Sequence, residues 1–393
     1  MKISKTVKKQ LLNGLFVVAL LVITLVILFT SNKDLSYKDI KEYFQECNLW
    51  MLTGALGCML LFILFEAISL HIVVRRFGYR PKFRSSLAYS TSDLYYSALT
   101  PSATGGQPAS AFYMVRDGID GGTSGFSLMF NIFAYTGAIL VMGLIAFIAG
   151  FSIFGELGTF VKVIVLIGFA LQIVLFTFFF ACMKYDKFVL KLGNGCISLV
   201  TKMKLMKKPE KWRKKWQDAV VKYHNDFEVV KKHPSLFVWT LLFNVLQRTS
   251  QLMITYFVCA AVLPSVSPIQ IFCAQAFITL GYNSFPLPGG SGVYELLYIQ
   301  SYRALGYGNH FVVVAVMITR LISYYLLMLV SGVYTLVYHM VGGKSKKIVP
   351  CVKEAIQTEE AIQTQAEETA LSAPTPKTEE TITTEERRED NGE

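Results

Sequence analysis

The chain has 393 residues, of which 53% are apolar and 17% are charged. Ordinary soluble domains are about 45 to 50% apolar and about 25% charged, so a purely soluble enzyme is excluded. The seven cysteines show no C-x-x-C spacing, which argues against a zinc site and against a disulfide framework.

The formal net charge of +11 combines two blocks of opposite sign. Residues 351–393 hold 12 acidic and 4 basic side chains, whereas the preceding 350 residues hold 34 basic and 15 acidic ones. A strongly basic body is typical of nucleic-acid binding or of the cytoplasmic loops of a membrane protein. The placement of the basic residues relative to apolar runs distinguishes the two.

Six apolar runs are long enough to cross a hydrocarbon core of about 30 Å, which takes about 20 helical residues. They span residues 11–30, 49–74, 126–150, 161–182, 235–263 and 311–340. Crossing the membrane at each run places all the basic clusters, at 2–9, 75–84, 183–234 and 344–347, on one side. We therefore expect a multi-pass protein of the cell membrane with both termini and the basic loop at 183–234 in the cytoplasm, and no nucleic-acid binding.

The two ends of the chain differ in kind. Residues 11–30 end without a small-residue cleavage site, so we interpret them as an uncleaved anchor rather than a signal peptide. Residues 348–393 are rich in Thr, Glu and Gln and lack apolar periodicity, which predicts an acidic disordered cytoplasmic tail. The membrane domain is expected to cover residues 1–347.

Two further segments are too polar to face lipid and too apolar for ordinary loops. Residues 85–117 contain a Gly/Pro break at 100–108, and residues 268–307 contain another at 283–292. Proline removes a backbone donor and glycine exposes backbone, so neither segment can remain one continuous helix in lipid. We expect two re-entrant helical hairpins whose breaks border a buried polar cavity. A Gly/Pro loop at the membrane surface is the alternative.

The two breaks occupy matching places in the chain. Gly105 follows Leu49, the start of one apolar run, by 56 residues, and Gly289 follows Ser235 by 54. The charge pattern orients the two hairpins oppositely, and inverted repeats with paired broken helices are typical of transporters. The expected fold is an all-α polytopic membrane protein with six full transmembrane helices plus two oppositely oriented re-entrant helical hairpins in an inverted repeat.

Four charged residues fall inside apolar segments, namely Glu66, Arg248, Glu295 and Arg320. Each would cost about 2.5 to 3.5 kcal/mol at a helix centre facing lipid, so we expect them to face inward. They form either a buried Glu–Arg pair that locks helices together, or a site in which an arginine binds a lipid phosphate while a carboxylate meets a cationic headgroup or an arginine. Asp93 either borders the same cavity or caps its hairpin helix.

No catalytic constellation emerges from the residues. The five histidines are dispersed, and the GGSGV segment at 289–293 lacks the final glycine of the G-x-S-x-G nucleophile pattern. We therefore expect no catalytic residues, no metal and no cofactor in this chain.

The two breaks carry a recognisable pattern. The segments TPSATGGQP at 100–108 and PLPGGSGVYE at 286–295 resemble the signature segments of the flippase-like transmembrane domain of the lysylphosphatidylglycerol synthase family. The resemblance covers residues 8–342 and implies a bacterial plasma membrane with membrane phospholipids as partners. Full-length members add a synthase domain that transfers lysine from lysyl-tRNA to phosphatidylglycerol. The 53 residues after Met340 are too few for it, so we expect it to be absent.

The resemblance implies a lipid translocase that moves a phospholipid, for example lysyl-phosphatidylglycerol, between leaflets. One alternative is the membrane component of a phosphatidylglycerol lysyltransferase or polyprenyl-lipid transferase whose catalytic domain is a separate chain, and another is a scaffold. The expected headgroup cavity involves Asp93, Thr100, Pro101, Gly105, Gly106, Gln107, Arg248, Asn283, Pro286, Pro288, Gly289, Gly290, Ser291, Gly292, Glu295 and Arg320, with Glu66 as a further buried charge.

Overall fold

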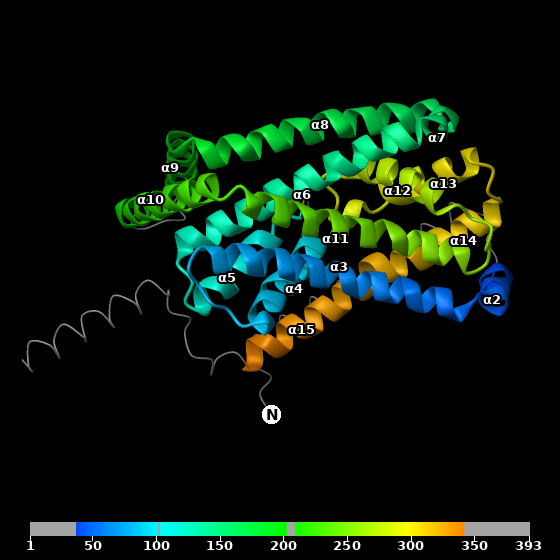
Figure 1. Cartoon of the computed structure of the whole chain (residues 1–393), viewed down its shortest axis with the longest axis horizontal. Helices are drawn as coiled ribbons and strands as arrows, with labels where there is room; N and C mark the ends of the chain where they lie inside the picture. The colour runs from blue at the N-terminus through cyan, green and yellow to red at the C-terminus, as the bar shows by residue number, and fades with distance from the viewer. Residues whose placement is uncertain (1–36, 101–102, 203–208, 342–393) are drawn as a thin grey trace, which may run out of the picture. The chain divides into compact units, whose positions relative to one another are not determined.

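A computed structural model describes residues 37–100, 103–202 and 209–341 (Figure 1). The chain divides into two units, residues 1–349 and 350–393, and every described residue belongs to the first. The expected anchor at 11–30, Pro101 and the expected tail at 348–393 lie outside the described residues.

The described residues form helices joined by turns, and none of them lies in a strand, which confirms the all-α class. The helical elements in chain order are α2 (Tyr37–Glu46), α3 (Leu49–Arg76), α4 (Phe83–Leu99), α5 (Gly106–Arg116), α6 (Gly121–Ala149), α7 (Phe151–Glu156), α8 (Thr159–Lys184), α9 (Asp186–Lys202), α10 (Pro209–Lys232), α11 (Ser235–Ala260), α12 (Pro268–Tyr282), η2 (Pro288–Gly290), α13 (Val293–Ala304), α14 (Asn309–Arg320), η3 (Leu321–Leu326) and α15 (Leu327–Val341).

Four helical segments within the described residues are long and apolar enough to cross a membrane: α3, α6, α8 and the continuous segment Asn309–Val341. They coincide with the runs expected at 49–74, 126–150, 161–182 and 311–340, so the chain is a membrane protein with several transmembrane helices. The run expected at 235–263 forms α11, whose 26 residues span about 39 Å. A polar stretch from Asn244 to Gln251 makes α11 less apolar than the other four. The count of six therefore stays a prediction.

Each Gly/Pro break separates two short helices, as the sequence predicts. α4 ends at Leu99 and α5 begins at Gly106, whereas α12 ends at Tyr282 and α13 begins at Val293. Figure 1 shows the α4–α5 pair and the α12–α13 pair toward opposite ends of the long helices. The helix–break–helix pattern is confirmed, while re-entry of these pairs into a membrane stays a prediction.

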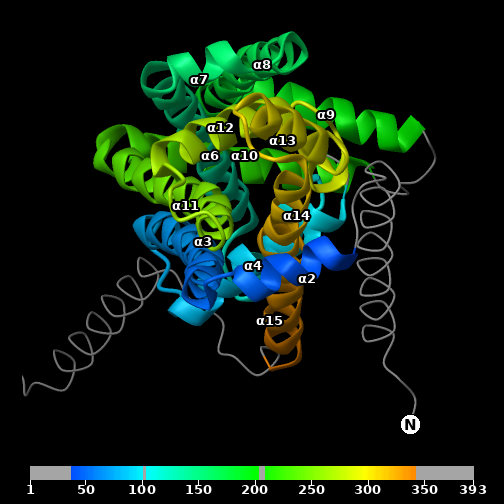
Figure 2. The ribbon, with the colours of Figure 1, turned by 90° about the vertical axis from the view of Figure 1, so that its right-hand side faces the viewer.

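The long helices α3 and α11 pack along one another over much of their length (Figure 1 and Figure 2). A Cβ added at Gly54 of α3 would lie 2.7 Å from the Phe257 ring of α11, so the glycine permits this close approach. These two helices open the two halves of the expected inverted repeat. Their contact joins the segments at which the two expected repeats begin.

The basic segment expected as a loop at 183–234 is largely helical, because it forms α9 and α10. Phe227 and Val230, one helical turn apart on α10, join a buried cluster with Phe126 and Phe130 of α6. This apolar spacing of three residues explains why part of the segment packs onto the bundle, while its cytoplasmic location stays a prediction.

The last transmembrane segment changes its winding after Arg320. Residues Leu321–Leu326 form a π-helical stretch, and π-helical turns inside α-helices occur frequently at functional sites. Within this stretch Tyr324 is buried, and its hydroxyl donates a hydrogen bond to the Ala98 carbonyl of α4 at 2.8 Å. The stretch therefore connects this segment to the end of the first short helix.

The contact between α8 and α12 depends on Gly168, because a Cβ there would lie 2.0 Å from the Leu280 carbonyl oxygen. Overpacking of this kind costs roughly 1 to 3 kcal/mol. We expect Gly168→Ala to lower the thermal unfolding midpoint of the purified protein in detergent. Gly57→Ala in α3 is the matched control, since nothing lies within 4 Å of its added Cβ. Equal midpoints for the two variants would contradict this account of the packing.

Candidate functional site

A cavity of about 660 Å³ lies among the helices and is bordered by both breaks. Its volume falls within the range of about 300 to 1,000 Å³ that is usual for ligand sites. Ala103, Thr104 and Gln107 line it from the first break, and Asn283, Pro286, Gly289 and Gly290 line it from the second. The cavity thus brings together segments about 180 residues apart in the sequence.

Asp93 connects the two helices of the first pair. The Ser97 hydroxyl donates to its Oδ1 at 3.0 Å, and Gln107 Nε2 of α5 donates to its Oδ2 at 2.7 Å. The close approach of α5 requires Gly106, because a Cβ there would lie 2.0 Å from Asp93 Oδ1. Asp93 lines the cavity, as one of the two interpretations of this residue expected.

Thr100 and Gly105 shape the first break without lining the cavity. The Thr100 hydroxyl donates to the Tyr96 carbonyl at 2.8 Å and accepts from the Gly105 N–H, also at 2.8 Å. One side chain therefore satisfies a carbonyl at the end of α4 and an N–H just before α5. Backbone groups at a break need such partners when water is absent.

The second break is built on three glycines with positive φ: Gly289 (57°), Gly290 (65°) and Gly292 (87°). A Cβ would lie 2.1 Å from the Tyr324 ring at Gly289 and 2.5 Å from the Tyr282 ring at Gly290. These two positions need glycine for both conformation and space. Ser291 and Gly292 do not line the cavity, and the side chain of Pro288 is outside the described residues.

Glu295 holds the second break to the last transmembrane segment. Its Oε1 accepts from Arg320 Nε at 2.7 Å, and its Oε2 accepts from the Gly292 N–H at 2.6 Å. The Arg320 guanidinium also lies over the rings of Tyr294 and Tyr324, at 4.1 and 5.4 Å from their centroids. The buried Glu–Arg pair is therefore present. Arg320 lines the cavity, whereas Glu295 acts behind it as a positioning residue.

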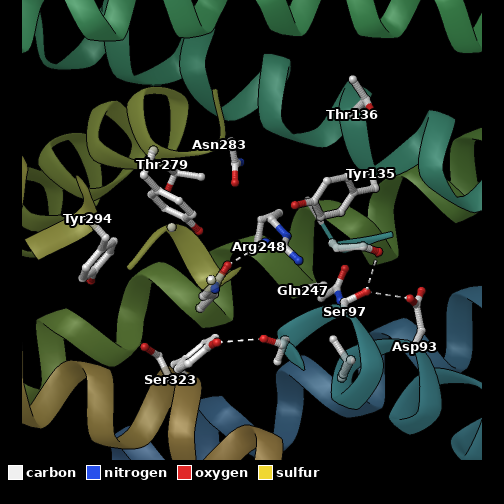
Figure 3. Close-up of a pocket in the computed structure, with 18 of the residues that line it drawn as sticks. Asp93, Ser97, Tyr135, Thr136, Gln247, Arg248, Thr279, Asn283, Tyr294 and Ser323 are labelled. Atoms are coloured by element: carbon white, nitrogen blue, oxygen red, sulfur yellow. Dashed lines mark hydrogen bonds between the residues drawn. The ribbon is translucent and has the colours of Figure 1, made fainter. Parts of the chain in front are cut away.

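Arg248 of α11 lies at the centre of the cavity, with Asp93 and Ser97 on one side and Tyr294 on the other (Figure 3). Its guanidinium is 4.3 Å from the Tyr135 ring centroid, and its Nη1 donates to Gln251 Oε1 at 2.7 Å. Its Nε is buried without a hydrogen-bond partner. No ion pair joins Arg248 to a carboxylate in the part of the chain that the structure describes.

Glu66 of α3 completes the charged lining of the cavity. Its Oε2 accepts from Gln247 Nε2 of α11 at 2.9 Å, and Asp93 of α4 lines the same cavity. All four expected intramembrane charges are buried, with exposed fractions between 4 and 6%. Of these four, only Glu295 does not reach the cavity.

Several cavity residues were not expected from the sequence, among them Ser97, Tyr135, Gln247 and Tyr324. Gln247 precedes Arg248 in the polar stretch of α11, so its position in an otherwise apolar run was an available signal. Tyr135 follows Asn131 by one helical turn on α6, and both line the cavity. Tyr324 follows Arg320 by the same spacing, so Arg320 was the signal available for it.

The broken helices and the buried charged cavity define a class, the integral membrane proteins whose helix breaks border a polar site. The sequence profile of the lysylphosphatidylglycerol synthase transmembrane region matches residues 16–331, and the chain belongs to this family. None of the curated proteins compared with the chain matches it. Membership of the family indicates a membrane function related to lipids.

We expect Glu295→Gln to leave the buried Arg320 charge without a carboxylate, which destabilises a protein by up to about 3 to 5 kcal/mol. Thermal unfolding in detergent should show a lower midpoint for this variant and for Arg320→Gln. The double variant should lose less stability than the sum of the single losses, because the second change removes the unpaired charge. Fully additive losses would show that the pair does not hold the break in place.

Proposed function

We propose that this chain moves a phospholipid between leaflets by sheltering the lipid headgroup in the cavity while the acyl chains remain in lipid. The observation that carries the proposal is Arg248, a buried arginine in the cavity that forms no ion pair with a described carboxylate. A buried charge without a direct ion-pair partner is costly in a protein interior. An anionic ligand that reaches the cavity would offset this cost.

A lipid phosphate fits this position chemically. The planar guanidinium presents several N–H donors, and its hydrogen bonds to phosphate oxygens are charge-assisted. Gln251 occupies one donor group, and the Nε–H has no protein partner. The Tyr135 ring lies against the guanidinium. Arg248 is therefore the residue that we assign to phosphate binding.

The two breaks support translocation rather than simple binding. Broken backbone in a membrane protein is tolerated where it borders a cavity, and paired breaks that enter from opposite sides are a transporter design. Both breaks line this cavity, and the helix pairs that they interrupt lie toward opposite ends of the bundle. The family suggests lysyl-phosphatidylglycerol as one candidate lipid, and phosphatidylglycerol offers the same phosphate chemistry.

The test uses purified protein in liposomes that contain a trace of fluorescent phosphatidylglycerol, with lysyl-phosphatidylglycerol competing in a second series. A membrane-impermeant quencher measures the exchange of label between leaflets. We expect the wild-type chain to accelerate exchange over protein-free liposomes. Arg248→Gln should slow it by about tenfold or more, because a hydrogen bond to a charged group contributes about 1.5 to 3 kcal/mol.

Arg80→Gln is the matched control, since Arg80 is exposed and does not line the cavity, and it should exchange lipid like the wild type. Each variant is first checked for an unchanged thermal unfolding midpoint. Wild-type exchange by a folded Arg248→Gln protein would overturn the assignment, and absence of exchange by the wild type would overturn the proposed function.

A further inference from the structure

Glu66 of α3 and Asp93 of α4 are both buried and line the same cavity. Neither carboxyl group forms an ion pair with a described cation. Two carboxylates that share a site of low dielectric repel each other when both are ionised, which favours a proton on one of them. The pair is therefore a place where the cavity can hold a proton.

Three neighbouring side chains donate hydrogen bonds to the carboxyl groups of Glu66 and Asp93. Gln247 of α11 donates to Glu66, and Ser97 of α4 and Gln107 of α5 donate to Asp93. These donors occupy carboxyl oxygens from within the protein, which leaves fewer lone pairs for an ammonium group of a ligand. A proton is smaller than an ammonium group, so the two carboxyl groups can accept it and keep the hydrogen bonds from Gln247, Ser97 and Gln107.

Arg248 is the charged group of α11 that acts electrostatically on Glu66. Arg320 of α14 also lines the cavity, but its charge is balanced by Glu295. Among the residues that the structure describes, the remaining ionisable groups that face the cavity are the phenols Tyr135 of α6, Tyr282 of α12, Tyr294 of α13 and Tyr324 of η3. With one shared proton, the pair and Arg248 together carry no net charge.

We propose that the cavity takes up one proton, onto the Glu66–Asp93 pair, each time it binds an anionic lipid phosphate at Arg248. The inference rests on the proposed function and names its coupling ion. Phosphate brings one negative charge to a neutral cavity, and a second proton on the pair restores neutrality. The proton comes from water onto a carboxylate oxygen and returns to water when the phosphate leaves.

Neutrality matters because the loaded cavity faces hydrocarbon, where a net charge is expensive. Binding linkage is reciprocal, so phosphate favours the proton and the proton favours phosphate by the same factor. The affinity for an anionic lipid should therefore rise by up to about tenfold for each unit by which pH falls, as linkage to one proton requires. A transmembrane proton gradient would drive the lipid in the direction of proton flow.

The binding test titrates the full chain in detergent with dihexanoyl phosphatidylglycerol, a short-chain lipid, in calorimetry buffers of different ionisation enthalpy. The dependence of the measured heat on the buffer reports protons taken up, and we expect about one per lipid bound. The double variant Glu66→Gln/Asp93→Asn mimics the fully protonated pair, so it should bind the lipid without proton uptake and with little dependence on pH. Asp117→Asn is the matched control, because Asp117 is buried outside the cavity and should leave the uptake unchanged.

A second measurement requires only the wild-type chain, in case the double variant fails to fold. Liposomes with an imposed pH gradient should accumulate fluorescent phosphatidylglycerol in the leaflet toward which protons flow, and a protonophore should abolish the bias. Lipid binding without proton uptake would overturn the inference. So would an exchange of lipid between leaflets whose final distribution does not depend on the pH gradient. Either result with lipid exchange intact leaves the proposed function standing, whereas loss of binding and exchange together would overturn both.

Discussion

The contact between Glu295 and Arg320 holds the second break together. One carboxylate oxygen accepts from the Gly292 N–H that opens α13, and the other accepts from an arginine of the last transmembrane segment. The short helix, the glycine turn and the long segment therefore share one buried side chain. Because a buried charge needs its partner, displacement of any of these parts would expose an unpaired ion or an unpaired backbone donor.

The first break satisfies its backbone in a different way. Thr100 bridges the end of α4 and the residue before α5 with neutral hydrogen bonds, and Asp93 joins the two helices through Gln107. No arginine pairs with Asp93 among the described residues, so this side of the cavity keeps its acidic character. The two halves thus share the order of helix, break and helix but differ in the charged side chains that they bring to the cavity. One half contributes carboxyl groups to the cavity, whereas the other contributes arginines.

α11 positions both kinds of group. Gln247 contacts Glu66 across the α3–α11 interface, and Arg248, the next residue, points toward the cavity centre (Figure 3). The same polar stretch makes α11 less apolar than the four clear membrane-crossing segments. Polar residues in such a helix are tolerated when they face protein or a cavity. The departure of α11 from an ordinary transmembrane composition is therefore explained by the site that it carries.

The sequence by itself determined the all-α class, four transmembrane runs, the two breaks and the inward burial of Glu66, Arg248, Glu295 and Arg320, because hydropathy, Gly/Pro placement and the cost of charge in lipid act locally. Only the tertiary structure decided which charges pair. Arg320 takes Glu295 and leaves Arg248 without an ion pair, since packing of distant helices sets these distances. It also decided that Glu66 and Asp93 line one cavity and that Tyr324 of the π-helical stretch reaches it. Such contacts depend on helix rotation and register, which local patterns do not specify.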